Sequence, residues 1–171
     1  ETVGSELIKD FIPRNPISLE TSSLIKKAAK ENSVFVGVRR GDYHATEAAR
    51  KLYGELPENY YLSAMEYINS YRSNPVFYVF SDDINWVKEH FHFEKYKVIY
   101  RMKEDVVSDF EELILMSSCH DAIISNSTFN YWGAWLIADQ KKIVVCPNRW
   151  FADGEYSEIL PPDWIRLPAF D

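Results

Sequence analysis

The chain has 171 residues, of which 46% are hydrophobic and 26% charged, a composition typical of a globular domain with a sizeable core. Its net charge of −7 excludes a generally basic surface for nucleic acid, and no apolar run approaches the roughly 20 residues of a membrane span. Its two cysteines, Cys119 and Cys146, are too few for a disulfide scaffold or a zinc site, and their apolar neighbours predict buried free thiols.

Residues 1–16 differ from the rest of the chain, because they are mixed in character and are broken by Pro13 and Pro16. The segment is therefore predicted to be a linker or the remnant of a domain that precedes it. The start at Glu1 rather than Met favours a fragment or a processed product. Residues 17–171 are predicted to form one domain.

Helical and strand patterns alternate along that domain, bounded by capping and turn residues. In chain order they predict a helix over Ser18–Asn32, a strand over Val34–Val38, a helix from Thr46 to Gly54, a helix from Pro57 to about Ser70, a strand over Val76–Phe80, a helix over Ile84–His90, a weaker strand over Lys97–Tyr100, a helix begun by the capping box Ser108–Glu111, a strand over Asp121–Ser125, a Trp-rich helix to about Asp139 and a strand over Lys142–Cys146. The proline-rich tail is predicted to be irregular.

Five strands alternating with helices predict a Rossmann-like α/β fold, a parallel sheet with helices on both faces. The expected strand order is 3-2-1-4-5, which places the switch point between the first and fourth strands. Ligands of such sheets bind at the carboxyl ends of the strands, next to the switch point.

The strand Val34–Val38 runs directly into two arginines, Arg39 and Arg40, followed by Gly41 and Asp42. Two guanidiniums suit a diphosphate because each can grip phosphate oxygens with a planar fork, and a glycine lets a ligand approach the backbone closely. The alternative is a surface turn with an internal Arg–Asp pair.

Two further polar clusters follow strands, at Ser81–Asp83 and at Ser125–Thr128. A sheet does not need polar groups at three carboxyl ends for its stability, so the three clusters together predict a binding site. Ser125, Asn126, Ser127 and Thr128 lie at a helix start, where free N–H groups and the helix dipole favour an anion. The alternative for this cluster is a simple N-cap at Ser127.

The acidic residues near these clusters have two interpretations each. Asp82 and Asp83 are candidates for binding ribose or for capping the helix that follows. Glu111 and Glu112 are candidates for accepting hydrogen bonds from a base edge, since a carboxylate pairs well with the N1 and N2 donors of guanine; the alternative is a capping box and a solvated face. The four histidines lack zinc-ligand spacing, so no metal site is predicted.

Three long motifs in order, V-x-V-R-R-G-D-Y, Y-V-F-S-D-D-I-N-W and S-N-S-T-F-N-Y-W-G-A-W-L, resemble the successive motifs of α1,2-fucosyltransferases over roughly Asn32 to Arg149. The resemblance implies a two-domain GT-B enzyme that transfers L-fucose from GDP-fucose to a sugar hydroxyl of a glycan acceptor, with inversion and without an obligatory metal or other cofactor. It also implies that Arg39 contacts the diphosphate and that Ser81–Asp83 and Ser125–Thr128 help form the donor site.

The chain departs from that family in two ways. Gly37 stands where the family usually has His, at a position expected to lie near the nucleotide base, so the strength or specificity of guanine binding is left open. The amino-terminal half with its glycine-rich G-x-G-N motif is absent, so this chain resembles the donor domain alone and is expected to be inactive by itself. A bacterial protein of this kind is expected in the cytoplasm or at the membrane periphery.

Inverting transfer needs a base to deprotonate the acceptor hydroxyl. Glu47 is the candidate, because R-R-x-D-x-x-x-T-E also resembles core α1,6-fucosyltransferases, and Asp42 is the rival. The alternatives to a transferase are a nucleotide-sugar binding module without catalysis and a structural domain that assembles through its tryptophans.

Overall fold

The computed structural model describes residues 3–14, 16–41, 46–102, 108–152, 154 and 159–170, with side chains described from residue 7 onward. Six strands form one parallel sheet, in the order β3-β2-β1-β4-β5-β6. The strands are β1 (Ser33–Val38), β2 (Val76–Ser81), β3 (Lys97–Tyr100), β4 (Asp121–Ile123), β5 (Val144–Pro147) and β6 (Ile165–Leu167).

This order confirms the predicted Rossmann-like topology and the switch point between β1 and β4. The tail is a correction to the prediction, because three of its residues form β6 and pair with β5. A strand of three residues carries too little alternation to be recognised, and its pairing is supplied by the neighbouring edge of the sheet.

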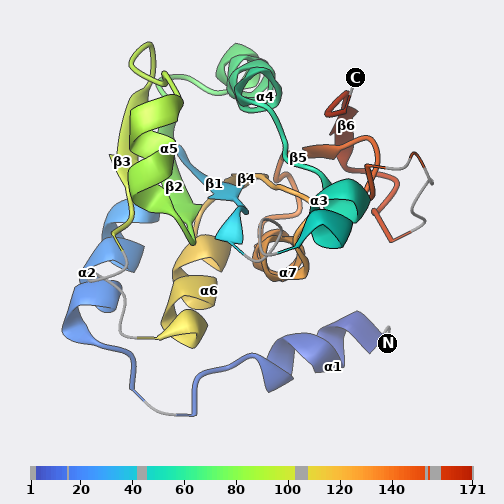
Figure 1. Ribbon diagram of the computed structural model, residues 1–171. Helices are drawn as coiled ribbons and strands as arrows, with labels where there is room; N and C mark the ends of the chain where they lie inside the picture. The colour runs from blue at the N-terminus through green and yellow to red at the C-terminus, as the bar shows by residue number, and fades with distance from the viewer. Residues whose placement is uncertain are drawn as a thin grey trace.

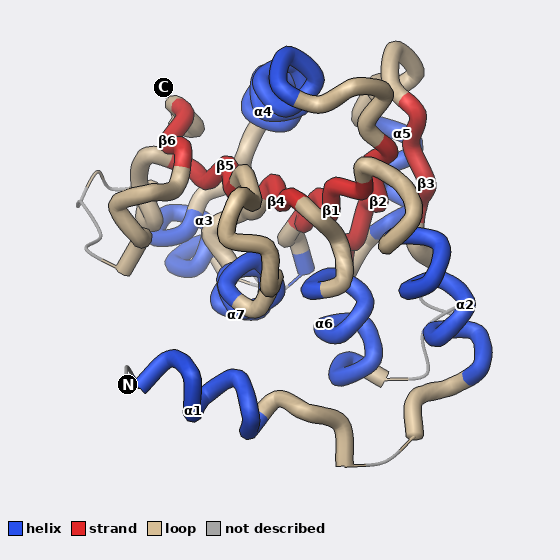
Figure 2. The backbone as a smooth tube through the Cα atoms, turned by 180° about the vertical axis from the view of Figure 1, so that it is seen from behind, coloured by secondary structure: helices blue, strands red, loops and turns tan. Residues whose placement is uncertain are grey.

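The helices pack on both faces of the sheet (Figures 1 and 2). They are α1 (Val3–Asp10), α2 (Leu19–Ala28), α3 (Glu47–Tyr53), α4 (Glu58–Tyr71), α5 (Ile84–His90), α6 (Asp109–Ser117) and α7 (Thr128–Trp135). Figure 2 shows the strands as a row with α4 and α5 on one side and α2, α6 and α7 on the other.

Each face of the sheet has its own apolar core, because successive side chains of a strand point to opposite faces. All six residues of β1 are buried. Val34, Val36 and Val38 belong to the core beneath α4 and α5, whereas Phe35 belongs to the core with α6 and α7. Cys119 and Cys146 are buried and free, as predicted, and burial raises the pKa of each thiol to about 12.

Most predicted helix starts are confirmed by their capping bonds. Ser18, Thr46, Asp83 and Ser108 each accept a hydrogen bond from a backbone N–H in the first turn of their helix. α7 ends at Trp135, before the predicted Asp139, and the ammonium of Lys142 donates to three carbonyls at that end.

Residues 1–16, predicted to be a linker or a remnant, contain the helix α1. This helix runs beneath α6 and α7 in Figures 1 and 2. Just beyond its end the ring of Phe11 stacks on Trp132 of α7, with centroids 5.4 Å apart. Among the described helices, none combines the length and the apolar character that a membrane span requires.

A buried ion pair fixes the amino end of the sheet, opposite the predicted site. Asp121 at the start of β4 is fully buried, and its carboxylate accepts two hydrogen bonds from Arg72, at 2.7 and 2.9 Å. It also accepts from the backbone N–H of Ile143 at 2.6 Å. The pair therefore joins the end of α4 to β4 and to the approach to β5.

Candidate functional site

A pocket of about 470 Å³ lies at the carboxyl ends of β1, β2 and β3 and at the starts of α6 and α7. Its volume is within the range of small-molecule sites. It is lined by residues from these five elements and the turns beside them: Val38, Arg39, Phe80, Ser81, Asp82, Arg101, Met102, Ser108, Asp109, Glu112, Ser127, Phe129 and Asn130. Five of the predicted donor-binding residues are in this set: Arg39, Ser81, Asp82, Glu112 and Ser127.

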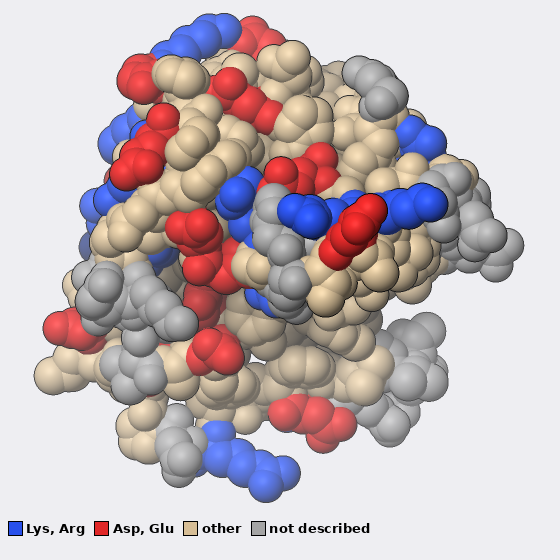
Figure 3. Space-filling view, in the orientation of Figure 1, with Lys and Arg blue, Asp and Glu red and all other residues tan. Residues whose placement is uncertain are grey.

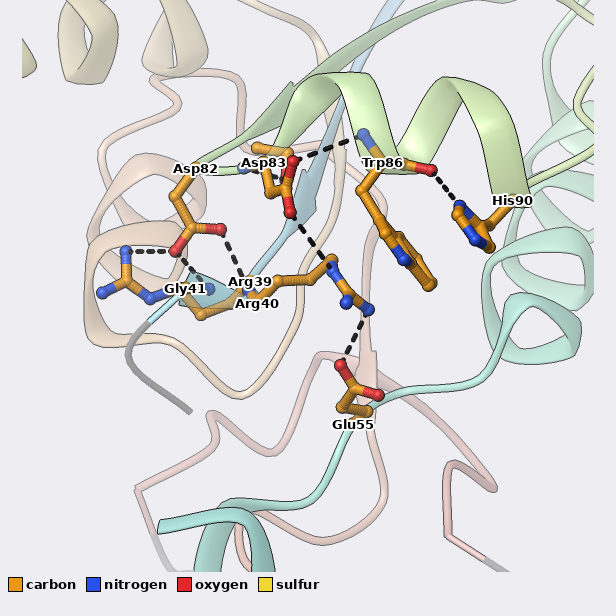
Figure 4. Close-up of polar contacts among 9 residues, drawn as sticks. Arg39, Arg40, Gly41, Glu55, Asp82, Asp83, Trp86 and His90 are labelled. Atoms are coloured by element: carbon orange, nitrogen blue, oxygen red, sulfur yellow. Dashed lines mark hydrogen bonds and ion pairs between the residues drawn. The ribbon is translucent and has the colours of Figure 1, made fainter. Parts of the chain in front are cut away.

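Arg39 lies in the turn after β1, with its side chain one-third exposed on the pocket wall. Its Nη1 is 3.1 Å from Oδ2 of Asp82. The same carboxylate accepts hydrogen bonds from the backbone N–H groups of Arg40, at 2.9 Å, and Gly41, at 2.8 Å. Asp82 therefore folds the turn and orients the guanidinium, and both of its oxygens are engaged (Figure 4).

The carboxylate of Asp82 also explains why position 41 is a glycine. A Cβ on Gly41 would lie 2.6 Å from Oδ2 of Asp82, a distance too short for any side chain. The glycine thus lets an acidic side chain approach the backbone, whereas the sequence favoured close approach of a ligand.

Arg40 points away from the pocket, in the opposite direction to Arg39 (Figure 4). Its guanidinium lies 3.1 Å above the ring of Trp86, and Nη1 is 2.7 Å from Oε1 of Glu55. Trp86 in turn stacks on His90 with ring planes only 7° apart. Arg40 therefore connects the segment after α3 to α5, and a direct role in the pocket does not follow from its position.

The start of α7 forms another wall of the pocket. Ser127 is the N-cap residue, but its side chain makes no capping bond, and the first helical bond runs from Tyr131 N–H to the Ser127 carbonyl. The N–H groups of the three residues between them have no acceptor within the helix. These donors and the helix dipole favour an anion beside Ser127.

The other residues of the cluster Ser125–Thr128 are bonded within the fold or do not line the pocket. Ser125 is buried and accepts a hydrogen bond from Nδ2 of Asn130 at 2.7 Å. The buried amide of Asn126 donates to the carbonyls of Tyr53, at 2.8 Å, and Trp150, at 2.9 Å, and so fastens the end of α3. Thr128 is exposed and does not line the pocket.

The two adjacent glutamates of α6 face different surroundings. Glu112 lines the pocket. Glu111 instead accepts hydrogen bonds from Ser18 N–H, at 2.9 Å, from the Ser18 hydroxyl, at 2.6 Å, and from the Thr21 hydroxyl. The side-chain bond from Ser18 is the main reason that the pKa of Glu111 is lowered. Glu111 thus fastens α2 to α6.

Of the two candidates for the catalytic base, the structure describes only Glu47. Glu47 is exposed at the first position of α3 and does not line the pocket. Asp42 lies outside the described residues. Asp83 caps α5 through Trp86 N–H, at 3.3 Å, which confirms the capping alternative for this residue.

Sequence reasoning missed several pocket residues, among them Arg101 and Asn130. Arg101 follows the weak strand β3 and is 7% exposed. It occupies the position after β3 that Arg39 occupies after β1, so the rule that singled out Arg39 applies to it as well. Asn130 lies in the first turn of α7, where its residue type alone gives no signal of a binding role.

The pocket combines charges of both signs, with Arg39 and Arg101 opposed by Asp82, Asp109 and Glu112. Figure 3 shows acidic and basic side chains side by side over the middle of one face rather than a uniform basic field. Within the described parts of the chain, no group of three or more histidine, cysteine or acidic side chains is placed to hold a metal ion.

Comparison with known proteins connects this geometry to a family. The sequence model of Glycosyl transferase family 11 matches residues 10–168. The chain belongs to this family. Membership of family 11 confirms the resemblance to the α1,2-fucosyltransferase family that the three motifs carry.

Curated relatives of the chain include the O-antigen biosynthesis glycosyltransferase WbnK of Escherichia coli, 38% identical over 80% of this chain and 45% of the relative. An alpha-1,2-colitosyltransferase of Escherichia coli is 36% identical over 92% of this chain and 54% of the relative. The galactoside alpha-(1,2)-fucosyltransferase 1 of Aotus azarae is 26% identical over 99% and 47%. The chain thus spans about half the length of these relatives. No solved structure shows a significant match to it.

Proposed function

We propose that this chain is the donor-binding domain of an inverting GT-B α1,2-fucosyltransferase and binds GDP-fucose for transfer of L-fucose to a sugar hydroxyl. The observation that carries the proposal is one pocket at the switch-point edge of the sheet, where Arg39 and Arg101 share walls with the start of α7. Membership of family 11 and the names of the relatives support the same reaction class.

The diphosphate belongs between the arginines and α7. Guanidinium forks bind phosphate oxygens in a bidentate manner, and the N–H groups after Ser127 add donors without a mobile side chain. Glu112, which also lines the pocket, suits the N1 and N2 donors of guanine. The same positive groups stabilise the GDP that leaves during transfer.

Glu47 remains the proposed catalytic base. It takes the proton of the acceptor hydroxyl while that oxygen bonds to the anomeric carbon of fucose and GDP departs from the opposite face. α3, which carries Glu47, buries none of its own residues. Its end is held by Asn126 on the Tyr53 carbonyl and by the Arg40–Glu55 ion pair, so these contacts set the position of the helix.

Transfer by this chain alone is not expected. The chain spans about half of its curated relatives, and we assign the acceptor cleft to a further, amino-terminal domain. Proximity of donor and acceptor supplies a large share of a transferase's rate, so a donor site alone gives binding without transfer. The second candidate, transfer of colitose, follows from the name of one relative, and a third is a binding module without catalysis.

Removal of divalent cations is expected to leave GDP binding unchanged, because two arginines and a helix start supply the positive charge that a metal would otherwise provide. Calorimetric titrations of GDP in EDTA and in Mg²⁺ test this. A strict requirement for Mg²⁺ or Mn²⁺ would contradict it and would make Asp82 and Asp83 candidates for metal ligands.

A thermal-shift panel tests the proposed function. GDP at about 100 times its dissociation constant adds about 2.7 kcal/mol of stability. For a chain of this size the melting temperature should then rise by about 5–10 °C. UDP, ADP and GMP at the same concentration are expected to give smaller shifts. Equal shifts for all four nucleotides would remove the donor assignment, and fucose transfer by this chain alone would show that the acceptor site is misplaced.

A further inference from the structure

The space beside Gly37 is filled by the side chain of Asn130. A Cβ on Gly37 would lie 2.3 Å from Nδ2, 2.4 Å from Cγ and 2.6 Å from Oδ1 of Asn130. Gly37 is a paired residue near the end of β1, and its φ is not among the positive values of the described chain. The backbone conformation therefore does not call for glycine at this position, but the carboxamide of Asn130 does.

Asn130 lies in the wall of the pocket, in the first turn of α7, and is 6% exposed. Its Nδ2 donates to the Ser125 hydroxyl at 2.7 Å, which fixes the carboxamide against β1 and β4. That bond uses one of two N–H groups, and an amide also carries an acceptor oxygen. The second N–H group and the oxygen are therefore the groups of Asn130 that a ligand in the pocket can bind.

The chemistry of the wall distinguishes Asn130 from its neighbours. Of the described residues that line the pocket, Asn130 alone carries a neutral amide, whereas the others are arginines, carboxylates, hydroxyls or apolar groups. A diphosphate is matched by the arginines and the helix start. A guanine edge presents the O6 acceptor next to the N1 and N2 donors, so it needs an N–H donor beside a carboxylate. Asn130 on α7 and Glu112 on α6 supply that combination from two helices that pack together.

We propose that Asn130 is a specificity-determining residue that donates to O6 of the donor's guanine and that Gly37 provides the space in which its carboxamide lies. The assignment rests on the proposed function, because it presupposes a guanine nucleotide in this pocket. It adds a base-reading residue and a steric dependence between positions 37 and 130. A side chain at position 37 and the observed position of Asn130 exclude each other.

Asn130→Asp is the sharpest variant, because it keeps the shape of the side chain and replaces its N–H donors by an acceptor. The added charge weakens every nucleoside diphosphate alike, so the quantity to measure is the ratio of the ADP and GDP dissociation constants. This ratio is expected to fall at least about tenfold in Asn130→Asp, and also in Asn130→Ala, as loss of a buried hydrogen bond predicts. Asn69→Asp, an exposed change on α4, is the matched control and should leave the ratio unchanged.

Gly37→Ala tests the steric dependence. The added methyl group must displace Asn130, so the ratio should fall in this variant as well, whereas Gly37→Ala in the Asn130→Ala background should cause no further loss. Melting temperatures establish that each variant is folded before titration.

A wild-type chain that prefers GDP, together with Asn130 variants that keep this preference, would overturn the inference and leave the proposed function intact. Independent, additive effects of the two positions would overturn the steric dependence. A wild-type chain that does not bind GDP at all would overturn the proposed function and the inference with it.

Discussion

Replacement of Arg39 by lysine is expected to weaken GDP binding about 10- to 150-fold, which corresponds to about 1.5–3 kcal/mol for a charge-assisted hydrogen bond. Lysine keeps the charge but lacks the planar fork that grips two phosphate oxygens at once. The fork of Arg39 is held ready on the pocket wall by Asp82, at 3.1 Å. Calorimetric titration of GDP into both proteins measures the effect.

Arg40→Lys is the matched control, because it makes the same change one residue further along. Arg40 faces Trp86 and Glu55 instead of the pocket. This variant should lower the melting temperature slightly, through the lost stacking on Trp86, and leave the GDP dissociation constant within about twofold of the wild-type value. Equal dissociation constants for wild type and Arg39→Lys would remove Arg39 from the site.

Replacement of Asp121 by alanine is expected to reduce the free energy of unfolding by about 3 kcal/mol, the lower end of the range for breaking a buried ion pair. Arg72 is left without its partner, but its side chain is 29% exposed and can turn to water, which limits the loss. At this chain length the melting temperature should fall by about 6–12 °C. Denaturant or thermal unfolding measures it.

The expected loss of stability in Asp121→Ala is large because the carboxylate of Asp121 is buried, so an exposed ion pair serves as the control. Glu66 and Lys95 also form an ion pair, but both side chains are more than half exposed. Glu66→Ala should therefore change the melting temperature little. A similar fall in melting temperature in the two variants would contradict the conclusion that the buried Asp121 ion pair stabilises the sheet. Because the pair lies at the amino end of the sheet, the folded Asp121→Ala protein should still bind GDP.

The sheet was predictable because its strands carry strong local signals. Val34–Val38 and Val76–Phe80 are continuous apolar runs that end in polar turns, and such runs between helices admit few topologies. β6 was missed because three residues of irregular sequence become a strand only through pairing with β5. α7 ends earlier than predicted, and the carbonyls at its end accept hydrogen bonds from Lys142, which lies seven residues beyond the last helical residue.

The site was predictable at the level of strand ends and less so at the level of single side chains. The rule that ligands bind at carboxyl ends found Arg39, Ser81, Asp82 and Ser127 in the pocket. The rule could not decide between residues adjacent in the sequence, because contacts with distant helices determine which of two adjacent side chains faces the pocket. Arg40 faces away from the pocket because its guanidinium stacks on Trp86 of α5. Glu111 faces away from it because its carboxylate accepts a hydrogen bond from Ser18 at the start of α2.

The close contact between Gly37 and Asn130 could not be predicted from the sequence either, because it too depends on contacts between distant elements. The two residues are far apart in the chain, and only the packing of α7 against β1 brings the carboxamide to the place of a missing side chain. Gly37 looked like the loss of a binding group, whereas the structure shows the space occupied by another polar group.

A structure of this chain with bound GDP tests the central claim most directly, since it shows where the diphosphate lies. The expected result places oxygens of the β-phosphate within about 3 Å of the Arg39 guanidinium and of the first N–H groups of α7, with the base toward Glu112 and Asn130. A diphosphate bound outside this pocket, or held by Arg40 with Arg39 left in solvent, would contradict the account.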